Sequence, residues 1–196
     1  MTTDIGLGVL ASGKGSNLRN LVERGYRVRA VATNRPAGSG AAAFARQRGL
    51  PLGEFPQSHY PSREARDASM LAWLQERGVE LVVDAGYDRI LSPDFVAAFP
   101  GRILNIHPSL LPAFGGGMDA VEQALAHGVK VSGCTVHVVT DDLDAGPILV
   151  QAAVPVLEND THDTLLARIQ VEEHRVLPEA IELVAERIKS RASVGQ

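Results

Sequence analysis

The chain has 196 residues, of which 45% are hydrophobic and 21% are charged, and its formal net charge is −4. This length and composition exclude a disordered chain and predict one globular domain spanning residues 1–196. The acidic balance, with Lys and Arg scattered along the chain, argues against a nucleic-acid-binding protein.

Cysteine content and hydropathy indicate the compartment. The single cysteine, Cys134, excludes an internal disulfide, and no Cys/His spacing is typical of a zinc site, so we expect a cytoplasmic protein without a metal. The apolar run at residues 5–11 lacks a preceding basic region and therefore predicts a strand, not a signal peptide. No apolar run approaches the ~20 residues of a membrane helix, so we expect no membrane partner. The sequence leaves open whether the protein is a monomer or a homodimer.

Strand-like and helix-like runs alternate along the chain. We expect strands near residues 5–11, 27–33, 51–55, 80–84 and 101–106, the third of them weak, and helices near residues 16–24, 38–48, 63–77 and 117–127. This alternation is typical of an α/β protein. It predicts a Rossmann-like, mostly parallel twisted sheet with helices on both faces.

The C-terminal third departs from this alternation. Two strand-like runs, at residues 131–140 and 148–156, are joined by an Asp/Gly/Pro-rich turn without a helix between them, so we expect them to pair antiparallel. Residues 161–188 have apolar side chains at helical spacing, with Thr161 as N-cap, and Pro178 should interrupt or kink this helix. We expect the tail from Ser190 onward to be loose.

A glycine-rich segment, Gly13-Lys14-Gly15-Ser16-Asn17, joins the first expected strand to the first expected helix. The unpaired N–H groups and positive dipole of a helix N-terminus are suited to a phosphate. The segment is neither a P-loop nor a complete G-x-G-x-x-G motif, so we do not predict an adenylate-bearing cofactor. In the alternative reading it is a tight turn in which Ser16 only caps the helix.

The most informative stretch is Asn-Ile-His-Pro-Ser-Leu-Leu-Pro at residues 105–112. It continues an apolar run and meets proline, which predicts a strand end at the carboxyl edge of the sheet, where α/β sheets bind ligands. Because side chains alternate along a strand, Asn105 and His107 should share one face. An amide and an imidazole would then converge on one cleft.

A carboxylate could complete this pair. Asp144 lies in the Asp/Gly/Pro-rich turn, where it could equally serve the turn itself. If it meets His107, it would orient the imidazole, while Asn105 would donate to a developing oxyanion. These three side chains could together catalyse acyl transfer without a covalent intermediate. The other histidines, including His137, are expected to be structural or exposed.

An ordered set of motifs carries a family resemblance across nearly the whole chain. The set is Gly13-Lys14-Gly15-Ser16-Asn17, Ser62-Arg63-Glu64, Arg89-Ile90-Leu91-Ser92-Pro93, residues 105–112, Gly133-Cys134-Thr135-Val136-His137 and Asp144-Ala145-Gly146-Pro147. In this order it closely resembles the phosphoribosylglycinamide formyltransferases of purine synthesis. The resemblance implies transfer of a formyl group from 10-formyltetrahydrofolate, as co-substrate, to the amine of glycinamide ribonucleotide, without a metal.

The resemblance also implies roles for individual residues. The catalytic trio would be Asn105, His107 and Asp144. The substrate-binding residues would be Gly15, Ser16, Asn17, Gln170 and Glu173, the first three holding the phosphate. The positions that contact the folate are matched by Arg63, Asp88, Arg89, Ile90 and Leu91.

Two departures from the family pattern stand out. Asp88 occupies a position where many relatives have an apolar residue. Residues 114–118, Phe-Gly-Gly-Gly-Met, replace a common Pro-Gly-containing stretch. Three consecutive glycines lose much conformational freedom when ordered, so we expect residues 113–118 to form a mobile lid over bound ligands.

Other functions share some of these residues. A formyltetrahydrofolate hydrolase, or another folate-dependent formyltransferase, could use the same Asn-x-His and Asp residues. Methionyl-tRNA formyltransferases usually have an additional domain and a basic surface, which this acidic, shorter chain lacks. A non-catalytic nucleotide-binding module is disfavoured by the incomplete glycine motif.

Overall fold

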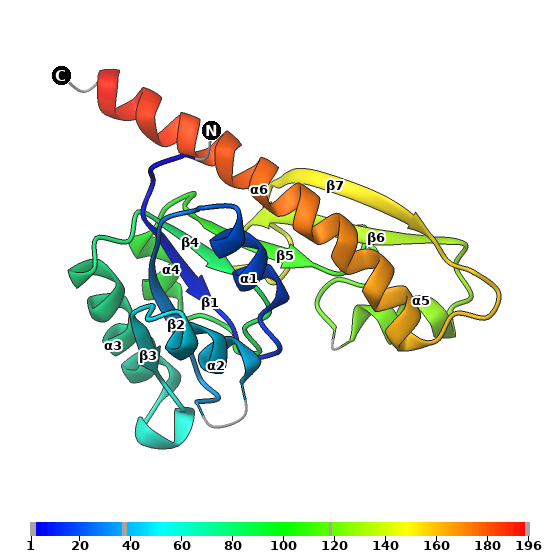
Figure 1. Ribbon diagram of the computed structural model, residues 1–196, viewed down its shortest axis with the longest axis horizontal. Coiled ribbons are helices and arrows are strands. Elements are labelled where there is room, and N and C mark those ends of the chain that lie inside the picture. Colours follow the sequence, from blue (N-terminus) through cyan, green and yellow to red (C-terminus); the bar gives the residue numbers. More distant parts are fainter. Residues whose placement is uncertain (1–2, 37–38, 118, 195–196) are drawn as a thin grey trace.

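A seven-stranded mixed sheet forms the centre of the protein (Figure 1). The structure, a computed structural model, describes residues 3–36, 39–117 and 119–194, the last four by their backbone alone. The strands are β1 (Leu7–Leu10), β2 (Val28–Thr33), β3 (Leu52–Glu54), β4 (Leu81–Asp84), β5 (Ile103–His107), β6 (Val131–Val138) and β7 (Ile148–Pro155). Their order is β3-β2-β1-β4-β5-β6-β7. The first five in sequence are parallel, and β6 and β7 are antiparallel to their neighbours.

Helices cover both faces of this sheet, as the sequence predicts. They are α1 (Ser16–Glu23), α2 (Gly40–Gln47), α3 (Arg63–Glu76), α4 (Pro93–Ala98), α5 (Ala120–Ala126) and α6 (His162–Val194), with a short 3-10 helix, η1 (Gln57–His59). Apolar residues of α1, α2, α5 and α6 pack on one face with Val9 and Val83. Residues of α3 and α4 pack on the other face with Leu10 and Val82. Neighbouring strand residues thus enter opposite cores, because both faces are covered.

The strand order reverses direction between β1 and β4. The chain moves outward from β1 through β2 to β3, then returns to place β4 on the other side of β1. In an open α/β sheet the crevice at such a reversal, outside the carboxyl ends of the strands, is the usual ligand site. The fold therefore brings the loops after β1, β4 and β5 to one edge.

Helix α6 contains 33 residues and lies across the face made by α1, α5 and the antiparallel strands (Figure 1). Thr161 caps it, since its hydroxyl accepts from the Thr164 N–H at 3.3 Å. The predicted interruption at Pro178 is wrong, because the helix continues through it. A proline has no N–H for the carbonyl four residues earlier. That carbonyl, of His174, instead accepts from the Asn20 side-chain amide at 2.9 Å.

Other differences from the predicted elements are local. The sequence prediction missed α4, whose six residues are too few to show a period, although Ser92 caps it and Pro93 begins it. The tail expected to be loose from Ser190 is helical as far as Val194, and residues 195–196 lie outside the described chain. Gly38, expected to begin the second helix, is also outside it, and α2 begins at Gly40.

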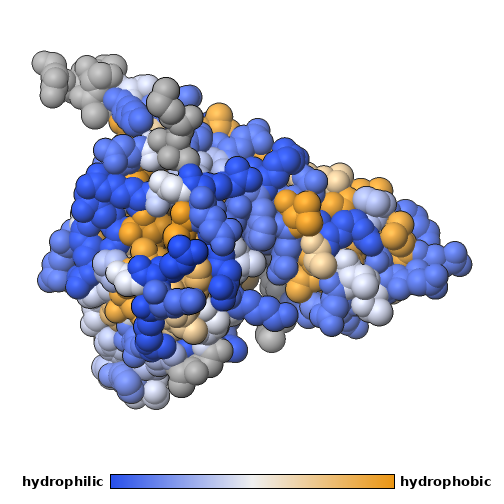
Figure 2. All heavy atoms as spheres, viewed as in Figure 1, coloured by the Kyte–Doolittle hydropathy of each residue, from blue (hydrophilic) through white to orange (hydrophobic). Residues whose placement is uncertain are grey.

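The face of the molecule drawn in Figure 2 is largely hydrophilic. Figure 2 shows apolar residues scattered over the viewed face without one continuous apolar patch. Within the described ranges, no helix combines the length and the apolar character that crossing a membrane would need. Even α6, which is long enough, carries charged residues along its length.

Candidate active site

Polar side chains from three adjacent strands meet at the carboxyl edge of the sheet. Asn105 of β5 lies directly opposite Asp84 of β4 and His137 of β6. Residues paired in register project from the same face of a sheet, so the three side chains form a row. The Nδ2 atom of Asn105 lies 3.1 Å from Nε2 of His137. His107, two residues after Asn105, projects from the same face.

Asp144 joins this row from the turn between β6 and β7. Its Oδ2 atom lies 3.6 Å from Nδ1 of His107, and its Oδ1 atom lies 3.6 Å from Nε2 of His137. The Asn105 amide donates to Oδ1 over 3.5 Å. The Gly116 N–H donates to Oδ2 over 2.9 Å. The structure thus brings together Asn105, His107 and Asp144, the three residues expected to be catalytic.

The backbone of Asp144 is in the left-handed region, with φ of 53°. A non-glycine residue adopts this conformation only where its surroundings hold it there, and Asp is among the residues that tolerate it best. The four contacts to its carboxylate supply that restraint. Asp144 therefore serves more than its own turn, which was the alternative reading of the sequence.

The environment sets the charges of this cluster. The neighbouring His137, the Gly116 N–H and the charge on His107 lower the pKa of Asp144 to about 2, against the effect of burial. Burial lowers the pKa of His107, and the Asp144 carboxylate opposes this effect. At neutral pH the site therefore holds a carboxylate beside an imidazole that is mostly neutral. Such an imidazole is able to accept a proton.

Asp84 is a titratable group that the sequence reading missed. Burial raises its pKa to about 7, although the N–H groups of Tyr87 and Gly86 and the charge of His137 oppose this effect. The Tyr87 N–H donates to Asp84 Oδ1 over 2.9 Å. Its place at the carboxyl end of β4 could have drawn attention to it. His137, by contrast, could not be recognised before the register of β5 and β6 was known.

The glycine-rich segment turns sharply into α1. Gly15 is the N-cap, with φ of 76°, and a Cβ there would lie 2.7 Å from the Cα of Ala41. Only glycine satisfies both conditions. The alternative in which Ser16 is the cap is wrong, because Ser16 is the first helical residue, and no side chain in the described part of the protein caps α1. The first-turn N–H groups thus remain available to a ligand such as a phosphate.

Asn17 and Glu173 meet beside this helix N-terminus. The Asn17 amide donates to the buried Glu173 carboxylate over 2.9 Å, and Asn17 Oδ1 is buried without a partner among the described residues. Burial raises the pKa of Glu173, which Asn17 partly offsets. An unsatisfied buried acceptor beside a buried carboxyl group is a costly arrangement without a ligand. Gln170, one turn earlier on α6, is half-buried.

The residues expected to contact a folate follow β4. The Asp88 carboxylate accepts from Ser12 Oγ over 3.0 Å and from Asn34 Nδ2 over 2.7 Å, and it forms an ion pair with Arg35. These contacts tie the segment after β4 to the segments after β1 and β2. They also lower the pKa of Asp88, against the effect of burial.

The neighbouring positions differ in exposure. Arg89 and Ile90 are exposed, and Leu91 is buried. Arg63, the first residue of α3, is exposed, and its guanidinium contacts Glu64 at 3.1 Å. The structure therefore does not bring Arg63 into the cluster around Asp144.

Two residues of the segment expected to form a lid contact the cluster. The Phe114 carbonyl lies 3.2 Å from His107 Nε2, and Gly116 holds Asp144. The Phe114 ring also packs on His127, with the ring centres 5.3 Å apart. Met118 lies outside the described residues. Phe114 and Gly116 are thus in direct contact with the proposed catalytic groups.

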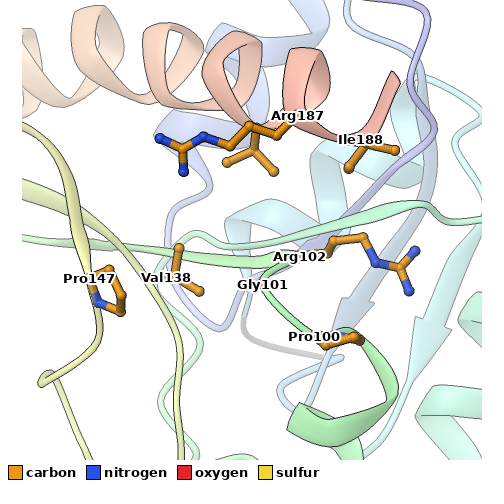
Figure 3. Close-up of a pocket in the computed structure, with 8 residues that line it drawn as sticks. Pro100, Gly101, Arg102, Val138, Pro147, Arg187 and Ile188 are labelled. Carbon is orange, nitrogen blue, oxygen red and sulfur yellow. The ribbon is translucent and has the colours of Figure 1, made fainter. Parts of the chain in front are cut away.

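A cavity of about 400 Å³ lies elsewhere, at the amino end of β5. It is lined by Pro100, Gly101, Arg102, Val138, Pro147, Val184, Arg187 and Ile188. Figure 3 shows that the guanidinium groups of Arg102 and Arg187 point in opposite directions. None of the candidate site residues lines this cavity.

Comparison with known proteins decides the family. The family model described as formyl transferase matches residues 7–181. The chain belongs to the formyl transferase family. It is 45% identical to the phosphoribosylglycinamide formyltransferase of Mycobacterium tuberculosis over 180 residues, covering 90% of this chain and 83% of that protein. It is 42% identical to the Escherichia coli protein of the same name, covering 91% of this chain and 86% of that protein.

A longer relative and a solved structure support the same family assignment. The human trifunctional purine biosynthetic protein adenosine-3 is 43% identical over 183 residues, which cover 90% of this chain and 18% of the human protein. The crystal structure of glycinamide ribonucleotide transformylase 1 from Symbiobacterium toebii superposes with a TM-score of 0.88 at 51% identity. It covers 93% of this chain and 88% of that one. The sequence matches thus establish the family, and the superposition shows that a member of known structure has the same fold.

Proposed function

We propose that this formyl transferase moves the formyl group of 10-formyltetrahydrofolate to the amine of glycinamide ribonucleotide, in purine biosynthesis. The observation that carries the proposal is the meeting of Asn105, His107 and Asp144 at the edge that also holds the uncapped N-terminus of α1. The likeness to phosphoribosylglycinamide formyltransferases over most of the chain supports the choice of substrates.

Each substrate has a proposed place. The N–H groups that follow Gly15, with the side chains of Ser16 and Asn17, bind the ribonucleotide phosphate, and Gln170 and Glu173 contact the rest of that substrate. The segment from Asp88 to Leu91 contacts the folate. Arg63, exposed at the start of α3, contacts a distant part of the same folate. The small size of both ligands fits a cytoplasmic enzyme that needs no macromolecular partner, whether monomer or homodimer.

The reaction is a direct acyl transfer. The amine nitrogen attacks the formyl carbon, a C–N bond forms, and the carbonyl oxygen becomes an oxyanion. Asn105 and His107 stabilise that oxyanion, which is worth ~3–4 kcal/mol per well-placed donor. His107 and Asp144 move the proton of the attacking nitrogen to the departing folate nitrogen. The bond between that nitrogen and the formyl carbon then breaks.

Two other functions make different predictions. A formyltetrahydrofolate hydrolase would release formate without the ribonucleotide, using the same His107 and Asp144. A nucleotide-binding module of the same fold would bind an adenylate and transfer nothing. The uncapped turn at Gly15 favours a single phosphate, because the segment lacks the third glycine that a dinucleotide requires.

The test combines the purified protein with both substrates and detects the formylated ribonucleotide by mass. A parallel reaction without the ribonucleotide measures formate. We expect product only in the complete mixture, and His107→Ala should lower kcat by ~10²–10⁴-fold. His59→Ala, in η1, is the matched control and should leave kcat unchanged. Formate release in the absence of ribonucleotide, at the full rate, would favour the hydrolase instead.

A further inference from the structure

A buried ion pair lies beneath the segment after β4. Arg66 and Asp67 of α3 have exposed side-chain fractions of 2% and 0%. The Arg66 Nε atom donates to Asp67 Oδ1 over 2.8 Å, and Nη2 approaches the same oxygen at 2.7 Å. The remaining Nη1 atom donates to Gln57 of η1 over 3.0 Å. Every part of the pair thus has a polar partner.

The pair also reaches out to one segment of backbone. Arg66 Nη2 donates to the Ile90 carbonyl over 3.2 Å. Asp67 Oδ2 accepts from the Ser92 N–H over 2.6 Å. The Arg66 guanidinium lies over the Tyr87 ring, 5.9 Å from its centre. Three points of residues 87–92 are therefore held by two adjacent side chains of α3.

Fold stability alone does not explain this arrangement. Removing two charges from water costs about as much as their attraction returns, and apolar residues of similar size often stabilise a protein equally well. What an apolar pair could not do is bind the Ile90 carbonyl and the Ser92 N–H. The distinctive contribution of the pair is therefore the position of this backbone segment.

The opposite side of the segment is where a ligand would bind. Ile90 is 59% exposed, and Asp88 and Arg89 beside it are also exposed. The segment follows β4, between the carboxyl ends of β1 and β5 that carry the glycine turn and His107. A loop fixed from beneath loses less conformational freedom when it binds a ligand, so its affinity is higher.

We propose that Arg66 and Asp67 are positioning residues for the folate, which hold residues 88–91 in the geometry that binds it. This inference rests on the proposed function, which assigns the folate to that segment. Neither residue touches the ligand. Their loss acts through the Ile90 carbonyl and the Ser92 N–H, and it leaves the ribonucleotide site at Gly15 unchanged.

The test replaces the pair with apolar residues, as Arg66→Met together with Asp67→Leu. We expect the melting temperature to stay within about 5 °C of the wild type, since buried pairs are often replaceable. The KM for 10-formyltetrahydrofolate should rise about 10-fold, and the KM for glycinamide ribonucleotide should stay within about twofold. The same substitutions at the exposed pair Arg27 and Asp4, which contact each other at 3.2 Å, are the control and should change neither KM.

A second variant and two direct measurements guard against a folding defect. Arg66→Lys keeps a charge beside Asp67 but loses the fork that reaches Ile90, so its folate KM should rise less than that of the double variant. Tetrahydrofolate binding, measured by calorimetry, should weaken in the same order. Amide hydrogen exchange of residues 87–92 in the ligand-free protein should accelerate in the double variant and not in the control.

The outcomes separate this inference from the proposed function. A wild type that binds tetrahydrofolate but forms no formylated ribonucleotide would refute the proposed function, and the binding series would still test the positioning role. A folded double variant with unchanged tetrahydrofolate affinity would overturn the positioning role alone. Equal increases in both KM values would also overturn it, since they would indicate a general structural role.

Discussion

The Nδ1 atom of His107 lies 3.6 Å from the Oδ2 atom of Asp144, although the two residues come from different parts of the fold. His107 ends β5, and Asp144 lies in the turn that joins β6 to β7. The antiparallel pairing of β6 with β5 brings that turn back over the strand end. The contact therefore depends on the only part of the described sheet that is not parallel.

Asp144→Asn should alter the titration of His107. The carboxylate raises the pKa of His107 against the effect of burial, so its removal should lower that pKa further. The imidazole would then be a weaker proton acceptor, because the carboxylate no longer stabilises its protonated form, and kcat should fall by about 10²-fold or more. Titration of the His107 ring by NMR measures the shift. Asp142→Asn, an exposed change in the same turn, should affect neither quantity, and an unchanged His107 pKa in Asp144→Asn would contradict the assigned coupling.

Asp84→Asn should flatten the dependence of stability on pH. The folded pKa of about 7 exceeds the ordinary value of 3.8, so the folded state binds the proton more tightly than the unfolded state. This contribution is complete below the ordinary value and is lost as the pH rises towards 7. An asparagine keeps an acceptor for the Tyr87 N–H and does not titrate. Melting temperatures from pH 5 to pH 8 should decline less in Asp84→Asn than in the wild type or in Asp141→Asn.

Glu173→Gln should raise the stability of the protein and weaken its binding of the ribonucleotide. Burial raises the pKa of Glu173, so its charged form is disfavoured in the folded protein, and this cost grows as the pH rises above the ordinary value of 4.5. Glutamine keeps an acceptor for Asn17 without the charge. Relief of this cost should raise the melting temperature at pH 8, by about 2–4 °C for each kcal/mol.

The same change should weaken ribonucleotide binding. We expect its KM to rise about 10-fold, since a charged acceptor is lost from the substrate site. Glu172→Gln, at the adjacent position of α6, is the control for both measurements. A variant that is more stable but keeps the wild-type KM would remove Glu173 from the proposed substrate site.

Asn20→Ala should destabilise the protein more when Pro178 is present than when it is replaced. The Asn20 amide serves the His174 carbonyl that the proline leaves without a helical partner. Its loss should cost about 1–3 kcal/mol. In a Pro178→Ala background the new N–H can bond to that carbonyl, so Asn20→Ala should cost less. Urea denaturation of the four proteins gives the coupling energy, and equal costs in both backgrounds would exclude this relationship.

Local patterns were sufficient for most of the secondary structure. Most strands of this sheet are short runs with an asparagine, glycine or proline within two residues of their end, as at Asn34, Gly86 and Pro108, and such signals are contained in neighbouring residues. The six residues of α4 are fewer than two helical turns and show no period. The continuity of α6 through Pro178 could not be foreseen either, because the compensating donor, Asn20, lies in α1.

The chain by itself determined the order of its strands and of its helices other than α4. It also determined the glycine turn at Gly15 and, through its motifs, the family it resembles. Each element and each motif depends on residues close together in sequence. Only the tertiary structure decided which distant groups share one site. Asp84 and His137 flank Asn105 through strand register, and Arg66 holds residues 87–92 through a helix on the other side of the sheet. Register and packing join residues that no local pattern connects, so the charges of Asp84, His107 and Asp144 also follow from the folded structure.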